Sequence, residues 1–161
     1  MRLKIDKLER VKFLSRVVKK EIHHLNYSAS KVFNQPFTIE RAKKLANDQE
    51  QAEQVEAFTS RFCRLQDTIG DKLLPAWLEI LSERSNVAID NLDKAEKIGV
   101  LPSVELWLEL HQLRNQMIHE YIEDLTLLVD ALQIAYKNLE FIVDVAESII
   151  KDLDKRINQA G

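Results

Sequence analysis

Apolar residues recur at intervals of three and four positions along most of the chain, which is the spacing of one face of an α-helix. In the first segment this stripe is formed by Leu8, Val11, Val18, Ile22 and Leu25. It predicts a helix over about residues 3–33. The helix should end before Pro36, because a proline disfavours the helical conformation of the residue that precedes it.

The second predicted helix covers about residues 38–82 and begins after Thr38, a residue type that caps helix N-termini. Its apolar face consists of Val55, Phe58, Phe62, Leu65, Ile69, Leu73, Trp77 and Ile80. At 1.5 Å per residue such a helix would be roughly 65 Å long, too long to stay straight in a compact domain. A break is therefore expected near Asn47 and Asp48, or a bend between Gly70 and Pro75, where proline removes a backbone donor.

Three further helices are predicted in the second half of the chain. A short one covers about residues 87–98 and stops at Gly99, a residue that readily takes the left-handed conformation. The next covers about residues 104–120, and the last about residues 124–157. With no internal repeat and no linker, residues 1–161 should form one all-α domain, an antiparallel bundle of four to five helices.

The composition agrees with an all-helical fold and argues against a membrane-spanning or secreted protein. The chain has 161 residues, of which only three are glycine and three proline, and 45% are apolar. No apolar run approaches the roughly 20 residues that span a bilayer, and the charged N-terminal segment does not have the pattern of a secretory signal. The single cysteine, Cys63, excludes an internal disulfide. We expect a soluble, cytoplasmic protein without a membrane partner.

Charge is distributed unevenly along the chain. The net charge is −3, but residues 1–44 contain 12 Lys and Arg against 4 Asp and Glu. On the first predicted helix, five basic residues fall on one face: Lys12, Arg16, Lys19, Lys20 and His23. This row has the chemistry to follow a phosphate backbone. Lys-rich surface rows are common, however, so an ordinary solvated helix face is the favoured interpretation of this row.

The stretch LRNQMIHEY, at the end of the helix predicted over 104–120, holds the candidate chemistry. It contains Arg114, Asn115, His119 and Tyr121. Arg114 and His119 are five residues apart, so an ideal α-helix separates them by roughly 140° of arc. Both can face one phosphate only if the last turn of the helix is distorted, or if two copies of the helix meet across a two-fold axis. The spacing therefore predicts a homodimer if the pair is catalytic.

These residue types suit cleavage of RNA without a metal. Histidine can take the proton of a 2′-hydroxyl or protonate the leaving 5′-oxygen, and the forked guanidinium of arginine can stabilise the charged phosphorane. Asn115 can orient either the substrate or His119. The chain has no HExxH motif, no cysteine pair and no glycine-rich phosphate loop, so no metal or cofactor is expected. In the alternative interpretation, Arg114 and His119 only cap or salt-bridge the helix end and Tyr121 is a core aromatic.

The block RNQMIHEY resembles the R-N-x-x-x-H-x-Y signature of HEPN domains, in particular of HepT-like toxins. The resemblance implies a HEPN-like bundle that forms a homodimer and cuts RNA with Arg114 and His119, supported by Asn115. It further implies a toxin–antitoxin pair in which a minimal nucleotidyltransferase is the antitoxin and attaches AMP to Tyr121. Bulky, anionic AMP beside the cleft would block an incoming phosphate.

Two other functions remain open from the sequence. The first two predicted helices are longer and more polar than a minimal HEPN domain requires, which suggests a non-catalytic substrate-binding subunit of a minimal nucleotidyltransferase. The other alternative is a purely structural helical interaction protein. In that case Arg114 and His119 should be scattered over the surface or locked in salt bridges away from any dimer cleft.

Overall fold

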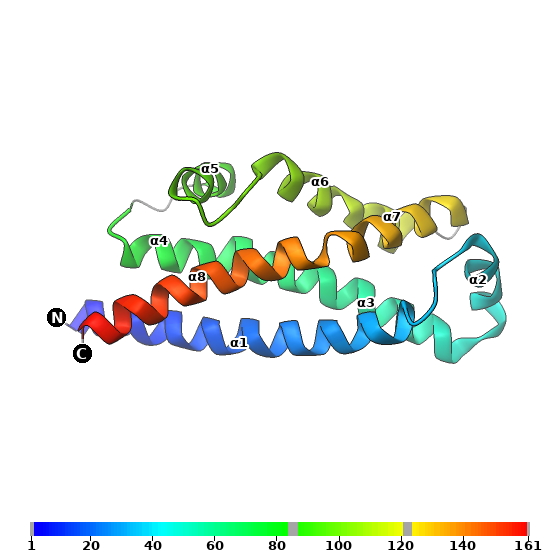
Figure 1. The fold of residues 1–161 in the computed structure, drawn as a ribbon, viewed down its shortest axis with the longest axis horizontal. Coiled ribbons are helices and arrows are strands. Elements are labelled where there is room, and N and C mark those ends of the chain that lie inside the picture. Colours follow the sequence, from blue (N-terminus) through cyan, green and yellow to red (C-terminus); the bar gives the residue numbers. More distant parts are fainter. Residues whose placement is uncertain (1, 84–86, 121–123, 161) are drawn as a thin grey trace.

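The computed structural model describes residues 2–83, 87–120 and 124–160, and within these ranges the side chains of residues 2–4, 119, 120 and 160 are not described. Every regular element in the described residues is a helix, which confirms the all-α prediction. The long helices α1 (Arg2–Val32), α3 (Gln49–Thr68) and α8 (Leu139–Ala160) lie along the long axis of the molecule (Figure 1). Helix α5 (Ala88–Ile98) is seen along its axis in the same view and therefore crosses them.

The segment predicted as one helix over 38–82 is divided where the sequence suggested. It comprises, in order, α2 (Ile39–Lys44), the 3-10 turn η1 (Leu45–Asn47), α3 (Gln49–Thr68), the π-helical turn η2 (Ile69–Leu73) and α4 (Leu74–Ile80). The first break lies at Asp48, whose side chain caps α3 by accepting the backbone N–H of Gln51 at 3.1 Å. The second is the π-helical turn before Pro75, which has no N–H to continue the α-helical pattern.

The C-terminal prediction of a single helix over 124–157 is wrong in one respect. Two helices, α7 (Leu125–Lys137) and α8 (Leu139–Ala160), meet at Asn138, whose φ of −107° and ψ of 13° are not helical. The side-chain Nδ2 of Asn138 donates to the carbonyl of Ile134 at 2.9 Å. Asparagine side chains compete in this way with the backbone for local hydrogen bonds, and the apolar spacing continues across the break without revealing it.

The other predicted elements agree with the structure. Helix α5 ends at Gly99, whose φ of 99° is in the left-handed region. Helix α6 (Val104–Asn115) begins after Ser103, whose hydroxyl accepts the backbone N–H of Leu106 at 3.0 Å. Within the described ranges, no helix combines the length and the apolar character needed to cross a bilayer.

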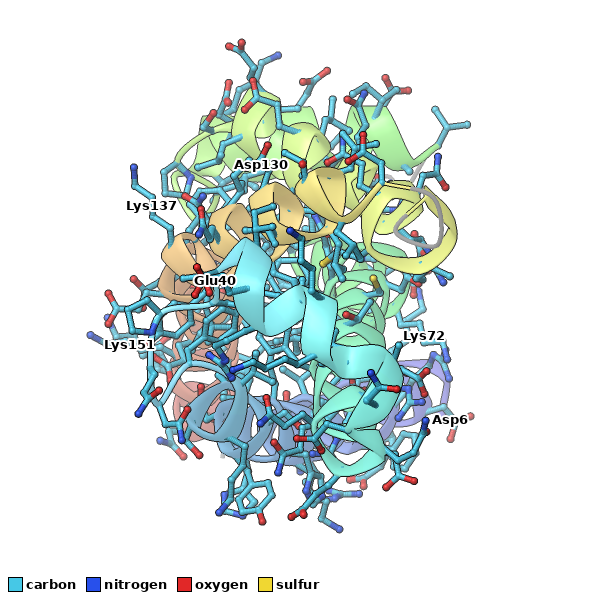
Figure 2. The ribbon with its side chains drawn as sticks, turned by 90° about the vertical axis from the view of Figure 1, so that its right-hand side faces the viewer. Asp6, Glu40, Lys72, Asp130, Lys137 and Lys151 are labelled. Carbon is cyan, nitrogen blue, oxygen red and sulfur yellow. The ribbon has the colours of Figure 1, made fainter. Side chains whose placement is uncertain are left out.

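The core lies where α1, α3, α4, α7 and α8 pack together. Its largest fully buried side chains include Trp77, Phe58 and Phe62, all members of the predicted apolar face of the second segment. Trp77 also donates its indole N–H to Asp152 of α8 at 2.8 Å. Charged side chains such as Lys137 and Lys151 project outward from the bundle (Figure 2). The packed helices thus form a rigid support for α6 and the turn that follows it.

Candidate functional site

The helix that carries the RNQMIHEY block changes its hydrogen-bond pattern inside the block. Helix α6 ends at Asn115, and residues Gln116–Glu120 form a second π-helical turn, η3. A π-helix joins residues i and i+5, so backbone positions five apart lie closer to one face than in an α-helix. The backbone that follows Arg114 therefore departs from the ideal α-helix for which a separation of roughly 140° is expected.

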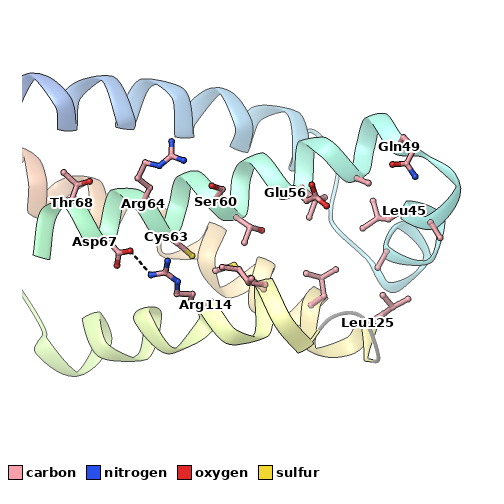
Figure 3. Close-up of a pocket in the computed structure, with 18 of the residues that line it drawn as sticks. Leu45, Gln49, Glu56, Ser60, Cys63, Arg64, Asp67, Thr68, Arg114 and Leu125 are labelled. Atoms are coloured by element: carbon pink, nitrogen blue, oxygen red, sulfur yellow. Dashed lines mark hydrogen bonds and ion pairs between the residues drawn. The ribbon is translucent and has the colours of Figure 1, made fainter. Parts of the chain in front are cut away.

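Arg114 lies on the last turn of α6 and reaches across to α3. Its Nη1 donates to Oδ2 of Asp67 at 2.7 Å, and the two side chains face each other in Figure 3. The hydrogen bond to Asp67, followed by the charge of that carboxylate, raises the pKa of Arg114. The side chain remains 44% exposed. Nε2 of His111, one turn earlier, lies 3.6 Å from the other oxygen of Asp67.

The Arg114–Asp67 pair borders a groove of about 1160 Å³. One wall is formed by α2 and α3, and the other by α6, η3 and α7 (Figure 3). Leu45 and Leu125 line one end together with the polar residues Gln49 and Glu56, while Arg64, Asp67 and Arg114 lie towards the other end. The groove therefore combines apolar and charged side chains, and it is wide enough to admit a molecule larger than a single phosphate.

Two buried groups on α3 face this groove. The hydroxyl of Thr59 has no hydrogen-bond partner among the described residues, although its side chain is only 5% exposed. An unpaired buried hydroxyl is costly, so a ligand that supplied a partner would gain affinity there. Cys63 is a free, buried thiol. Burial raises its pKa to about 11, so it is protonated at neutral pH and is not an activated nucleophile.

The structure describes part of the predicted site. Arg114 lies at the groove, and Asn115 is exposed on the final residue of α6. The backbone of His119 belongs to η3, but its side chain is not among those described, and Tyr121 lies outside the described residues. The predicted roles of His119 and Tyr121 therefore stay predictions. In the described part of the chain, no cluster of three His, Cys, Asp or Glu side chains is arranged to hold a metal ion.

Sequence reasoning missed Asp67, Thr59 and the groove itself. Asp67 is 47 residues from Arg114 along the chain, and no short-range spacing connects them. Thr59 lies among the apolar positions of α3 and was indistinguishable from a core residue. One pattern in the sequence could have indicated this site. Cys63, Arg64 and Asp67 lie within about one turn of α3, so polar side chains lie beside the apolar stripe of that helix.

No family model, no curated protein and no solved structure matches this chain. The function must therefore follow from the residues and their arrangement.

Proposed function

We propose that this chain is a HEPN-like toxin, a metal-independent endoribonuclease whose active site is composed at the interface of a homodimer. The observation that supports a catalytic role for this helix end is the π-helical turn η3, which begins two residues after Arg114 and contains residue 119. The homodimer in the proposal follows from the resemblance to HEPN domains. Single π-helical turns are rare and are frequent at functional sites. Neither proline nor glycine occurs within Gln116–Glu120, so neither of the usual helix-breaking residues accounts for this turn.

In the proposed reaction, each copy contributes one arginine and one histidine. His119 of one copy accepts the proton of the 2′-hydroxyl, whose oxygen then forms a bond to the adjacent phosphorus. The bond from phosphorus to the 5′-oxygen breaks, and His119 of the second copy protonates that oxygen. Arg114 stabilises the extra negative charge of the phosphorane. Asn115, next to Arg114 and exposed, is available to orient the RNA.

Regulation in this proposal follows from Tyr121. A partner nucleotidyltransferase transfers AMP from ATP to the tyrosine hydroxyl and releases pyrophosphate. The attached AMP adds bulk and negative charge two residues from His119, and so opposes entry of the RNA backbone. Intact mass of the protein produced with and without the nucleotidyltransferase tests this step. Without an AMP-sized increase in mass, Tyr121 is not the point of control.

The experiment for the reaction is RNA cleavage by the purified protein in EDTA. We expect products with 2′,3′-cyclic phosphate ends, and loss of cleavage on His119→Ala. His23→Ala is the matched control, because it removes an exposed imidazole on α1 that does not line the groove. Light scattering of both variants should give the mass of the wild-type dimer. Undiminished cleavage by His119→Ala, or an equal loss in His23→Ala, would contradict the assignment.

A second candidate function has its own supporting observation. Arg114 is already paired with Asp67, and the groove beside it extends beyond this pair to Leu45 and Leu125. This favours a non-catalytic subunit that presents the groove to a minimal nucleotidyltransferase or to its substrate. Such a subunit should co-purify with the nucleotidyltransferase and cut no RNA at any concentration. Cleavage that depends on His119 would exclude it.

A further inference from the structure

The outer face of α1 carries one continuous row of aromatic and basic side chains. Successive members are three or four residues apart, so they lie on one side of the helix, and all are exposed. This row, the outer strip, consists of Phe13, Arg16, Lys20, His24, Tyr27 and Lys31. At 1.5 Å per residue it is about 27 Å long. Phe13 is 52% exposed and Tyr27 is 59% exposed, although both lie on a helix whose other side is packed into the bundle.

Each exposed ring in the outer strip is paired with a cation. The guanidinium of Arg16 lies 6.0 Å from the centre of the Phe13 ring. The ammonium of Lys31 lies 5.5 Å from the centre of the Tyr27 ring. A flat aromatic face beside a positive charge is the arrangement that binds an unstacked base and its phosphate together. A solvated basic surface would not need the two rings.

None of the six residues of the outer strip is acidic, and the carboxylate of Glu9, one turn before Phe13, pairs with Lys12 at 3.5 Å. Between Phe13 and Lys31 the sequence contains one acidic residue, Glu21. Its carboxylate accepts a hydrogen bond from the hydroxyl of Thr68 on α3 at 2.9 Å, and it lines a hollow together with His24. Burial raises the pKa of Glu21. The strip residues themselves are all basic or aromatic.

From this arrangement we propose that the outer strip of α1 binds single-stranded nucleic acid without sequence preference. Bases stack on Phe13 and Tyr27, and the phosphates of the strand contact Arg16, Lys20 and Lys31. Base stacking on aromatic side chains tolerates any base, because every base has a π-face. The basic residues of the strip give the binding its dependence on salt.

Other occupants fit the outer strip less well. A duplex offers phosphates but no unstacked base for Phe13 and Tyr27. A membrane-surface helix buries a continuous apolar face, whereas these two rings are separated by 14 positions that include exposed cations. A second copy of the strip would bring like charges together. Single-stranded nucleic acid is the partner that uses both the rings and the charges.

The outer strip is connected to the candidate active site through Arg64. A small hollow of about 140 Å³ is lined by His24 of the strip together with Glu21, Arg61 and Arg64. Arg64 also lines the large groove that contains Arg114. A strand bound along α1 therefore has a cationic route towards Arg114. This delivery role rests on the proposed function, whereas the binding itself does not.

The test is fluorescence anisotropy with a labelled 2′-O-methyl RNA strand, which lacks the nucleophilic hydroxyl and reports binding without cleavage. The first variant, Phe13→Leu with Tyr27→Leu, keeps apolar area and helix propensity but removes both π-faces. We expect its affinity to fall about tenfold or more, the effect of losing one or two stacked bases. The second variant, Lys20→Glu with Lys31→Glu, should weaken binding further and lower the slope of log K against log salt by about 1.4.

The matched control is Lys137→Glu with Lys151→Glu, which makes the same change in net charge at exposed sites of α7 and α8. Its affinity should stay within about threefold of wild type, because separated surface charges are screened by salt. Failure of the wild type to bind, unchanged affinity of the leucine variant, or an equal loss in the control would overturn the inference. So would tighter strip-dependent binding to anionic lipid vesicles.

The outcome can be separated from that of the proposed function. Strip-dependent binding of the 2′-O-methyl strand without any cleavage of ordinary RNA would contradict the endoribonuclease and leave this inference intact. If the protein cleaves RNA but the outer-strip variants bind the 2′-O-methyl strand as tightly as wild type, the endoribonuclease proposal stands and this inference is contradicted.

Discussion

Arg114 and Arg156 each place a guanidinium nitrogen 2.7 Å from an aspartate oxygen, but the two pairs have different surroundings. Arg156 and Asp152 are one turn apart on α8, and Asp152 also accepts the indole N–H of Trp77 on α4. That carboxylate ties two core helices together and gives a buried indole its partner. The packing of the bundle accounts for the pair without any further role.

The Arg114–Asp67 pair joins α6 to α3 at the edge of the large groove. Arg114 is followed, after Asn115, by the π-helical turn η3. Among the described residues, Asp67 accepts no hydrogen bond from a buried donor such as Trp77. An exposed ion pair contributes little to stability, typically about 0–1 kcal/mol. The same two residue types therefore form a tie to a buried indole in one place and an ion pair at the edge of a groove in the other.

The largest difference should be in activity. Arg114→Ala should lower the rate of RNA cleavage by about 100-fold or more, the usual cost of removing a group that stabilises transition-state charge. Arg156→Ala, which breaks the similar pair on α8, should leave the rate within about twofold, since surface pairs away from a site have small effects. Initial rates in EDTA measure both. Equal losses would show that the two pairs do not differ in function.

Stability should show the opposite order. Asp152→Ala leaves the buried indole N–H of Trp77 without its acceptor, so the free energy of unfolding should fall by about 1–3 kcal/mol. Asp67→Ala, the matched change at the groove, should cost less than about 1 kcal/mol because that pair is exposed to solvent. Urea titration followed by circular dichroism gives both values. If Asp67→Ala loses more unfolding free energy than Asp152→Ala, the Arg156–Asp152 pair is not the more important of the two for stability.

The smallest effect is a dependence of stability on pH. Burial tends to raise the pKa of Asp152, but the hydrogen bonds from Arg156 and Trp77 outweigh it and leave the pKa below 3.8. Because the folded pKa lies below the unfolded one, the ionised carboxylate stabilises the fold above pH 3.8 and loses this contribution as pH falls through the folded pKa. The stability advantage of wild type over Asp152→Asn should therefore shrink below about pH 4. Urea titrations from about pH 7 to below about pH 4 measure this difference. If the free energy of unfolding differs between wild type and Asp152→Asn by the same amount at every pH, the prediction is wrong.

The helices themselves were largely predictable because their signals are local. The three- and four-residue apolar spacing predicted α1, Gly99 predicted the end of α5, and Asp48 and Pro75 predicted where the second segment is interrupted. The break at Asn138 escaped prediction, because the apolar stripe passes through it and only a side-chain hydrogen bond to Ile134 marks it. Residues form a helix because of the residues next to them in the sequence. A single polar side chain can nevertheless interrupt that helix.

By itself the sequence determined an all-helical chain, the spacing of Arg114 and His119, and a first helix with one basic face. The tertiary structure alone decided that Arg114 pairs with Asp67, that Thr59 is buried without a partner among the described residues, and that α3, α6 and α7 enclose a groove. Helical periodicity acts over one turn, within reach of a sequence pattern. Which helices pack together depends on contacts between residues tens of positions apart, and no local pattern specifies them.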